Sequence, residues 1–311
     1  MLSIEPRSYV LVSACRNEEA YIEGLVSAIA AQTARPVRWI IVDDGSTDAT
    51  YVRAEELSRN LSFLQIVKMP GGRPRSFASQ VFAAQHGYEV LKGLQFDFIG
   101  FLDADIRVEP DYYERLIGFL ESDSTLGLCG GAVLDQYGDH LENIRRGSED
   151  FHVPGGVQFF RRNVFEQIGG YVPIEGGGQD TIADVMAMMH GWKIRVFPEL
   201  EALHLRPDGF ARDHMLRRGI KWGRKFYLLG YHPIFYLGQC VRRLGQRPWI
   251  LCSVCQLLGF AIASVKGETR PVSKEFVRFL RKVQMRRLRL AALGHHERNR
   301  KPILPQPRNA Q

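Results

Sequence analysis

The chain has 311 residues, of which 45% are hydrophobic and 24% are charged, and its net charge is +7. This length allows one large domain with a sizeable core together with a smaller appendage. The five cysteines lie scattered, mostly in apolar stretches, which argues against a secreted disulfide framework and favours a reducing compartment. We expect no signal peptide, because the first apolar run extends only from Tyr9 to Ala14.

Apolar runs and amphipathic stretches alternate over the first hundred residues. The predicted strands cover 8–13, 37–42, 61–67 and 96–102, and the predicted helices cover 17–31, 46–58 and 76–91. This alternation is typical of a doubly wound, mainly parallel α/β sheet of the Rossmann-like type, whose right-handed crossovers bring the strand ends to one rim. The ends of the first, second and fourth strands, at 10–16, 42–48 and 103–105, should therefore lie together.

Two polar loops follow the first two predicted strands. Residues 17–19, with the sequence Asn-Glu-Glu, are predicted to open the first helix, because acidic side chains in a first turn interact favourably with the helix dipole. In the second loop Gly45 permits a tight turn, and Ser46 or Thr47 is predicted to cap the next helix.

The stretch from Phe96 to Asp105 predicts a buried strand that stops at two carboxylates. Asp is a poor strand residue, so Asp103 and Asp105 belong to the loop at the strand's carboxyl end, where open α/β sheets bind ligands. Two carboxylates one residue apart suit a hard divalent cation such as Mg²⁺ or Mn²⁺. The alternative is an ordinary pair of surface turn aspartates.

The pattern changes after residue 109. A helix is predicted over 110–120, a strand over 126–137, a loop over 138–155, a strand over 157–160 and a short helix over 163–168. Glycines at 169–170 and 176–178 mark flexible backbone before a helix at 179–190. Two further strands are predicted at 193–197 and 201–205.

The C-terminal third is strongly basic. Residues 206–311 contain 23 Lys and Arg against five Asp and Glu, so that residues 1–205 carry a net charge of −11. An aromatic and basic helix is predicted over 217–229, an uncharged apolar stretch over 248–265 and an amphipathic helix over 273–293. The polar tail at 294–311 is expected to be disordered.

Basic segments of this kind suit either nucleic acid or an anionic membrane surface. The stretch 248–265 is at the low end of spanning length, so we expect a re-entrant or interface-lying helix rather than a span, with a buried core helix as the alternative. The apolar runs favour monotopic attachment to a membrane over nucleic-acid binding. Cys252 and Cys255, inside the apolar stretch, are expected to pack as small hydrophobic residues.

Several motifs in a fixed order resemble the family 2 glycosyltransferases, which are inverting enzymes of the GT-A fold that use nucleotide sugars. The first three are residues 13–19 (SACRNEE), 42–48 (VDDGSTD) and 102–105 (LDAD). The resemblance extends through the Gly-Gly-Tyr at 169–171, Gln179-Asp180 and His204, and it covers about residues 8–206. It implies a GT-A catalytic domain and a glycosyltransferase activity.

The resemblance implies a set of residues that bind the nucleotide sugar. These are Ala14, Arg16, Glu18, Val42, Asp44, Asp103, Ala104 and Asp105. Where the family usually has Pro-x-Tyr-Asn-Glu, this chain has Ala-Cys-Arg-Asn-Glu, so Glu18 matches while the first and third positions depart. Helix capping is the alternative role for Asp43 and Asp44.

By the same resemblance Asp105 is the direct ligand of a Mg²⁺ or Mn²⁺ ion, with Asp103 beside it. His204 stands where related enzymes often supply a third ligand, although a lone His can also be structural. The ion would neutralise the leaving diphosphate. Arg206, like Arg73 and Arg75, could meet diphosphate oxygens or be a solvated surface residue.

Asp180 is the candidate catalytic base. An inverting transfer needs a carboxylate that removes the proton of the acceptor hydroxyl on the side opposite the leaving diphosphate. The family generally has an acidic pair at this point, and Gln179-Asp180 keeps only the second carboxylate. The alternative is an Asp that interacts with the helix dipole. Asp184, one turn later, is expected to be a surface or supporting residue.

These expectations define the domains and the function. Residues 1–206 form the catalytic domain, with a nucleotide-sugar-binding half at 1–109 and an acceptor-binding half at 110–206, and residues 207–293 associate with the membrane. The resemblance is to bacterial enzymes of exopolysaccharide or cell-envelope glycan synthesis. It implies a polyprenyl-linked glycan acceptor at the cytoplasmic face of the inner membrane.

Two alternatives stay open. One is a polyprenyl-phosphate monosaccharide synthase, which differs only in its acceptor. The other is a non-enzymatic basic protein that binds nucleic acid or membranes.

Overall fold

The computed structural model describes residues 7–70, 77–143, 149–174, 176–206, 212–243 and 250–292. The chain divides into two compact units. The first comprises Met1–Pro173 and Gln179–Pro207, and the second comprises Ile174–Gly178 and Asp208–Gln311. The predicted tail at 294–311 lies outside the described residues, as do Arg73 and Arg75.

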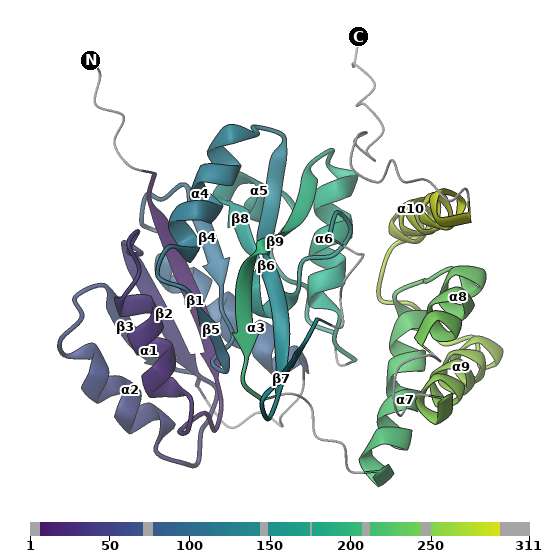
Figure 1. Ribbon diagram of the computed structural model, residues 1–311, viewed down its shortest axis with the longest axis horizontal. Helices are drawn as coiled ribbons and strands as arrows, with labels where there is room; N and C mark the ends of the chain where they lie inside the picture. Colours follow the sequence, from purple (N-terminus) through teal and green to yellow (C-terminus); the bar gives the residue numbers. More distant parts are fainter. Residues whose placement is uncertain are drawn as a thin grey trace. The chain divides into compact units, whose positions relative to one another are not determined.

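The first unit contains one mixed sheet (Figure 1). Its strands follow the order β3 (Leu64–Lys68), β2 (Arg38–Asp43), β1 (Tyr9–Cys15), β4 (Phe98–Phe101), β8 (Phe159–Arg161), β6 (Leu126–Tyr137), β9 (Lys193–His204) and β5 (Ile106–Val108). The first four are parallel; β8 runs antiparallel to β4 and β6, and β6 and β9 are again parallel. The predicted α/β fold is therefore confirmed, with a parallel first half and a mixed second half.

Helices cover both faces of this sheet, because its central strands are apolar on both sides. They are α1 (Ile22–Ala30), α2 (Thr50–Ser58), α3 (Phe77–Leu91), α4 (Tyr112–Ser122), α5 (Arg162–Gln167) and α6 (Gln179–Met189). Tyr9 and Leu11 of β1 belong to the core under α1 and α4. Val12 faces α3 on the other side, where Gly87 allows the helix to approach closely. Figure 1 shows α1 in front of the sheet and α3 behind it.

The start of the first helix differs from the prediction. Helix α1 begins at Ile22 rather than at Asn17, whose φ of 57° places it in the left-handed region. Ser46 and Thr47 do not cap α2, because both bond to the Asn17 loop instead. The N-cap residue of α2 is Ala49, and the Asp48 carboxylate before it accepts the Thr50 N–H at 3.0 Å.

Two other predictions are corrected in the second half of the sheet. The expected loop at 138–155 contains β7 (His140–Glu142), which pairs with β6, and β5 at 106–108 was not predicted. The two strands expected at 193–197 and 201–205 form the single strand β9, whose pairing with β6 is irregular between Phe197 and Glu201. The extra residues at this irregularity interrupt the alternation, which explains why the sequence pattern breaks there.

The second unit is helical. It consists of α7 (Arg212–Leu228), α8 (Pro233–Arg243), α9 (Ile250–Val265) and α10 (Lys274–Ala292). Tyr236 of α8 and Phe260 of α9 stack at 5.0 Å in its core, and Cys252 and Cys255 are buried free thiols, as predicted. None of the described helices has the length and apolar character that crossing a bilayer requires.

Glycines allow α7 and α9 to pack with their backbones in close contact. A Cβ atom on Gly223 would lie 1.9 Å from the Gln256 carbonyl oxygen, and a Cβ on Gly259 would lie 2.1 Å from the Ile220 carbonyl oxygen. Since neither obstacle is a flexible side chain, the two helices can adopt this packing only with glycine at both positions.

We expect Gly223→Ala to destabilise the second unit by roughly 1–3 kcal/mol, because the added methyl group forces the helices apart. Gly238→Ala is the matched control, since its Cβ would make an ordinary 3.7 Å contact with Leu288. Urea unfolding followed by circular dichroism measures both changes. Equal unfolding midpoints for the two variants would show that the close packing is unimportant.

Candidate active site

The carboxyl ends of β1, β2 and β4 lie side by side at one rim of the sheet. Cys15 of β1 pairs with Asp43 of β2, and Val12 of β1 pairs with Phe101 of β4. Beyond the strands, the Asp44 N–H donates to the Cys15 carbonyl oxygen at 2.9 Å. The three segments that the sequence predicts at a common rim therefore meet there.

The two loops that follow β1 and β2 are held together by hydrogen bonds. The Thr47 N–H donates to Asn17 Oδ1 at 2.8 Å, and the Asn17 N–H donates to Ser46 Oγ at 3.0 Å. The Glu18 N–H donates to Thr50 Oγ1 at 2.8 Å. Each loop thus fixes the backbone of the other, and together they form one wall of the rim.

The predicted nucleoside-binding residues differ in their accessibility. Arg16 Nη1 lies 3.7 Å from Asp44 Oδ2, so these two side chains come together across the two loops. Glu18 is buried, and its carboxylate accepts a hydrogen bond from Arg206. Ala14 is half-buried. Val42 is fully buried beneath α3 and is not open to a ligand in this structure.

Asp103 is the first carboxylate after β4. Its Oδ1 accepts a hydrogen bond from Gln80 Nε2 of α3 at 2.9 Å, and its N–H donates to the Gly156 carbonyl oxygen. A Cβ on Gly156 would lie 2.6 Å from Asp103 Oδ2, so only glycine leaves room for the carboxylate. Ala104 is buried behind it. Neither Gln80 nor Gly156 was identified from the sequence.

Several carboxylates act on Asp103 at once. Burial and, after it, the charge of Asp105 raise the pKa of Asp103 to about 7, with smaller contributions from Glu18 and Asp180. His204 acts in the opposite direction. The candidate base Asp180 is therefore electrostatically coupled to the residues after β4, although it lies 77 positions later in the chain.

His204 ends β9 between two carboxylates. It pairs with Asp135 of β6 in the sheet, and its Nδ1 lies 2.6 Å from Asp135 Oδ1. Its Nε2 lies 3.5 Å from Asp105 Oδ2. Burial disfavours the charged ring, but the contacts with Asp105 and Asp135 raise the pKa of His204 to about 9. Asp135 was not identified from the sequence because it lies within a long strand and belongs to no motif.

Arg206 lies across the same carboxylates. Its Nη2 is 2.6 Å from Glu18 Oε1 and 3.1 Å from Asp105 Oδ2. Burial alone would raise the pKa of Asp105, but the charges of His204 and Arg206 outweigh it and lower that pKa. The guanidinium of Arg206 thus places a positive charge beside Asp105, the predicted ligand of the Mg²⁺ or Mn²⁺ ion.

The side chains at this rim include oxygen and nitrogen donors of the kinds that divalent metal ions bind. Within the described ranges no three His, Cys, Asp or Glu side chains form a ready-made metal cluster. The pair of Asp105 and His204 nevertheless has suitable chemistry, because Asp135 holds Nδ1 and leaves Nε2 facing Asp105. A carboxylate behind the second ring nitrogen is the usual support for a metal-binding histidine. The residues present therefore fit a divalent ion such as Mn²⁺.

Asp180 lies in the first turn of α6. The Thr181 N–H donates to its Oδ1 at 2.7 Å, and a Cβ atom on Gly155 would lie 3.3 Å from its Cβ. His152 Nε2 lies 3.7 Å from its Oδ2. With 23% of its side chain exposed, Asp180 is partly open to solvent.

Asp184 is a supporting residue of the interior and not a surface residue. Its side chain is 1% exposed, and its carboxylate contacts His152 and accepts a hydrogen bond from Gln158. Burial raises the pKa of Asp184 to about 6, although His152 acts to lower it. The helical spacing placed Asp184 on the same side of α6 as Asp180, but no motif indicated His152 or Gln158.

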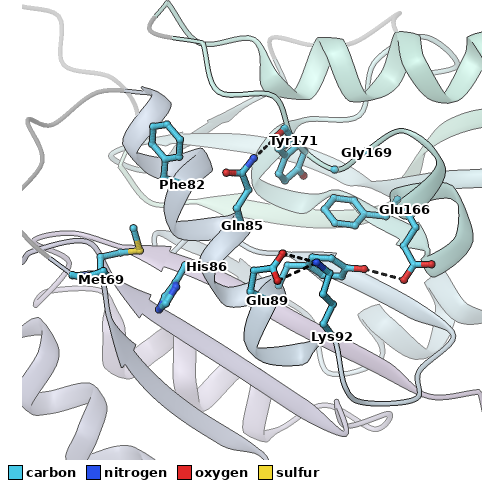
Figure 2. Close-up of a pocket in the computed structure, with 13 residues that line it drawn as sticks. Met69, Phe82, Gln85, His86, Glu89, Lys92, Glu166, Gly169 and Tyr171 are labelled. Atoms are coloured by element: carbon cyan, nitrogen blue, oxygen red, sulfur yellow. Dashed lines mark hydrogen bonds and ion pairs between the residues drawn. The ribbon is translucent and has the colours of Figure 1, made fainter.

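A hollow of about 640 Å³ lies beside α3 (Figure 2). Aromatic and apolar side chains line it, with a charged rim formed by Glu89, Lys92 and Glu166. Figure 2 shows Gln85 bonded to the Tyr171 carbonyl oxygen across this space. Its described lining includes neither Asp103, Asp105 nor Asp180, so the hollow is separate from the site formed by these three carboxylates.

The family model described as Glycosyl transferase family 2 matches residues 10–174, which is more than half of the chain. Among curated relatives, the beta-monoglucosyldiacylglycerol synthase of Synechocystis sp. is 25% identical over 246 residues, which cover 70% of this chain and 48% of that protein. The dodecaprenyl-phosphate galacturonate synthase of Rhizobium johnstonii is 36% identical over 109 residues, covering 34% and 30%. The chain thus spans half or less of the length of these relatives.

A solved structure shows the same fold. The mannosyltransferase PcManGT from Pyrobaculum calidifontis, in complex with GDP-Man and Mn²⁺, matches with a TM-score of 0.55 and 15% identity. The match covers 95% of this chain and 89% of that one. The predicted relationship is therefore confirmed: the chain belongs to glycosyl transferase family 2.

Proposed function

We propose that this enzyme transfers a sugar, with inversion, from a nucleoside-diphosphate sugar to a lipid-linked oligosaccharide at the cytoplasmic face of the inner membrane. The observation that carries the proposal is the gathering of Asp103, Asp105 and Asp180 at one rim, where the charges of Asp105 and Asp180 both act on Asp103. A single site then contains carboxylates for both the donor and the acceptor. In this proposal residues 1–109 bind the donor, 110–206 bind the acceptor and 207–293 associate with the membrane.

The donor is held by the wall that follows β1 and β2. Asp44 accepts hydrogen bonds from the base, and Glu18 and Arg16 line the nucleoside pocket beside it. Arg206 moves its guanidinium from the Asp105 carboxylate to the diphosphate, for which its planar donor fork is suited. Support comes from the Pyrobaculum mannosyltransferase, whose structure contains a nucleotide sugar and Mn²⁺.

Asp105, His204 and Asp103 are the proposed ligands of a Mg²⁺ or Mn²⁺ ion. When bound, the ion neutralises charge on the diphosphate. Asp180 removes the proton from the acceptor hydroxyl while that oxygen attacks C1 of the donor sugar. The bond from C1 to the diphosphate breaks at the same time, and the electron pair leaves with the diphosphate.

A lipid acceptor is supported by the names of the two relatives. One is a synthase of a glucosyldiacylglycerol and the other a dodecaprenyl-phosphate galacturonate synthase. The second name also favours the alternative acceptor, a polyprenyl phosphate that receives a single sugar. The two acceptors differ in their phosphate groups and in the presence of a glycan.

A transfer assay separates these acceptors. Radiolabelled UDP-sugars and GDP-sugars are incubated with Mn²⁺ and either polyprenyl phosphate or a polyprenyl-diphosphate-linked oligosaccharide in detergent. Label on the oligosaccharide, absent with polyprenyl phosphate, is the expected result. Label on polyprenyl phosphate alone would replace the first acceptor by the second, and no transfer to any lipid would contradict a lipid acceptor.

Exposed apolar side chains support membrane association of the helical unit. On α9, Val254, Leu258 and Ile262 are each 45–51% exposed, on the side opposite the buried Phe260 and Ala263. A soluble helix normally presents polar residues on such a face.

Helix α8 presents a further exposed apolar stripe, and helix α10 presents a row of exposed basic side chains. On α8, Ile234, Leu237 and Val241 form a second exposed apolar stripe at helical spacing. On α10, exposed basic side chains recur along one side at positions 274, 278, 282, 286 and 289. Apolar stripes that enter the acyl boundary and basic residues that meet anionic headgroups are the features of a helical membrane attachment.

We expect Leu258→Asp to weaken binding to liposomes that contain anionic lipid at least tenfold, since an exposed leucine loses its apolar contact. Val52→Asp is the matched control, because Val52 is a 54% exposed residue of α2 in the other unit. Co-sedimentation at two salt concentrations measures the binding. Equal binding of both variants, or displacement of the enzyme from liposomes by DNA, would argue against the membrane surface.

A further inference from the structure

One imidazole bridges two carboxylates of helix α6. His152 Nδ1 lies 2.7 Å from Asp184 Oδ2, and His152 Nε2 lies 3.7 Å from Asp180 Oδ2. Asp180 and Asp184 are four residues apart, so they project from consecutive turns on the same side of the helix. The proposed catalytic base thus has a histidine behind it, and that histidine has its own carboxylate.

Buried hydrogen bonds fix the second carboxylate. Asp184 Oδ1 accepts from Gln158 Nε2 at 3.1 Å and faces the Val153 N–H at 3.4 Å. Gln158 is fully buried, and its Oε1 accepts the Tyr171 hydroxyl at 2.7 Å. With its oxygens held in this way, Asp184 is a fixed acceptor for the Nδ1–H of His152. This bond sets the tautomer of the ring and directs Nε2 toward Asp180.

The carboxylate of Asp180 is oriented from the other side. The Thr181 N–H donates to Oδ1 at 2.7 Å, and Gly155 lies beside the side chain, where a larger residue would have its Cβ 3.6 Å from Oδ2. Oδ2 is consequently the oxygen that faces the imidazole. The ring is 27% exposed, so a proton on Nε2 can pass to water.

Building on the proposed role of Asp180 as base, we propose that His152 is its positioning residue and receives the proton that Asp180 removes from the acceptor. Asp180 takes the hydroxyl proton as the new C1–O bond forms and the diphosphate departs with the electron pair. The proton then moves from Asp180 to Nε2, while the Nδ1–H stays bonded to Asp184. The imidazolium releases it to solvent, and the carboxylate is ready for the next turnover.

Three variants test this inference in the full chain with the transfer assay. His152→Ala should lower kcat on the order of 10²-fold, the lower end of what a positioned acid–base group contributes. His152→Gln can still form hydrogen bonds but cannot accept a proton, so its kcat should be equally low. Asp184→Asn should lower kcat in the same direction. Stabilisation by the nucleoside diphosphate with Mn²⁺ should stay unchanged in all three.

Added imidazole should restore part of the kcat of His152→Ala and have no effect on the wild type or on Asp180→Asn. Wild-type kcat in His152→Gln would overturn the inference, because hydrogen bonding without proton transfer would then be sufficient. Loss of nucleotide stabilisation in His152→Gln would likewise overturn it in favour of a structural role. An active Asp180→Asn would instead refute the proposed base, so the two failures are distinguishable.

Discussion

Asp180→Asn is expected to lower kcat by roughly 10²–10⁴-fold, which is the range of a positioned general base. Asparagine occupies the same space and can still accept the Thr181 N–H that Oδ1 accepts in the wild type. It cannot take the proton of the acceptor hydroxyl. Donor binding should therefore stay intact while turnover is lost, and the transfer assay combined with nucleotide titration separates the two.

The control for this variant is an aspartate that also lies at the start of a helix but has no proposed role in catalysis. Asp111 precedes α4, half-exposed, and makes no capping hydrogen bond there. If Asp180 serves only the helix dipole, Asp180→Asn and Asp111→Asn should both leave turnover unchanged and cost at most about 1 kcal/mol of stability. Retained turnover in Asp180→Asn would remove it as the base.

Asp105→Asn is expected to abolish the metal-dependent part of donor binding. The substitution removes the negative charge that faces His204 Nε2 and Arg206, and an amide is a much weaker ligand for a hard cation than a carboxylate. Binding of the nucleoside diphosphate, followed by calorimetry with and without Mn²⁺, should become the same under both conditions.

Asp135→Asn should weaken metal binding at the same site only in part, and it is therefore compared with Asp105→Asn. It keeps the shape of the side chain behind His204 Nδ1 but loses its charge, so metal affinity should fall roughly 10- to 100-fold without being abolished. A metal requirement that is unaltered in both variants would place the ion elsewhere. Full loss in Asp105→Asn with partial loss in Asp135→Asn supports the ligand pair.

The fold could be predicted because its first four strands and β6 are apolar runs separated by helical patterns and loops. Strand β6 covers Leu126–Tyr137, the range that the pattern predicted, and β4 ends just before Asp103. Helix α8 was missed although Phe235, Tyr236 and Cys240 have helical spacing, because the prediction for that region rested on charge and motif.

The details of the site were less predictable, because they depend on contacts between distant segments. Asn17 was assigned to a helix on local preference, whereas its hydrogen bonds to residues 46 and 47 hold it in a loop. Asp135 and His204 lie 69 positions apart and meet only through strand pairing. His152 precedes Asp184 by 32 positions, so helical periodicity alone could not indicate their contact.

Thermal stability in the presence of nucleoside diphosphates tests the central claim most directly. UDP, GDP, CDP and ADP are compared with and without Mn²⁺, because a ligand that binds only the folded state raises its stability by about 2.7 kcal/mol at 100 times its Kd. A shift for one nucleotide that requires the metal ion is the predicted result, and it names the base of the donor. No shift for any of the four, in protein shown to be folded, would contradict a nucleotide-sugar site at this rim.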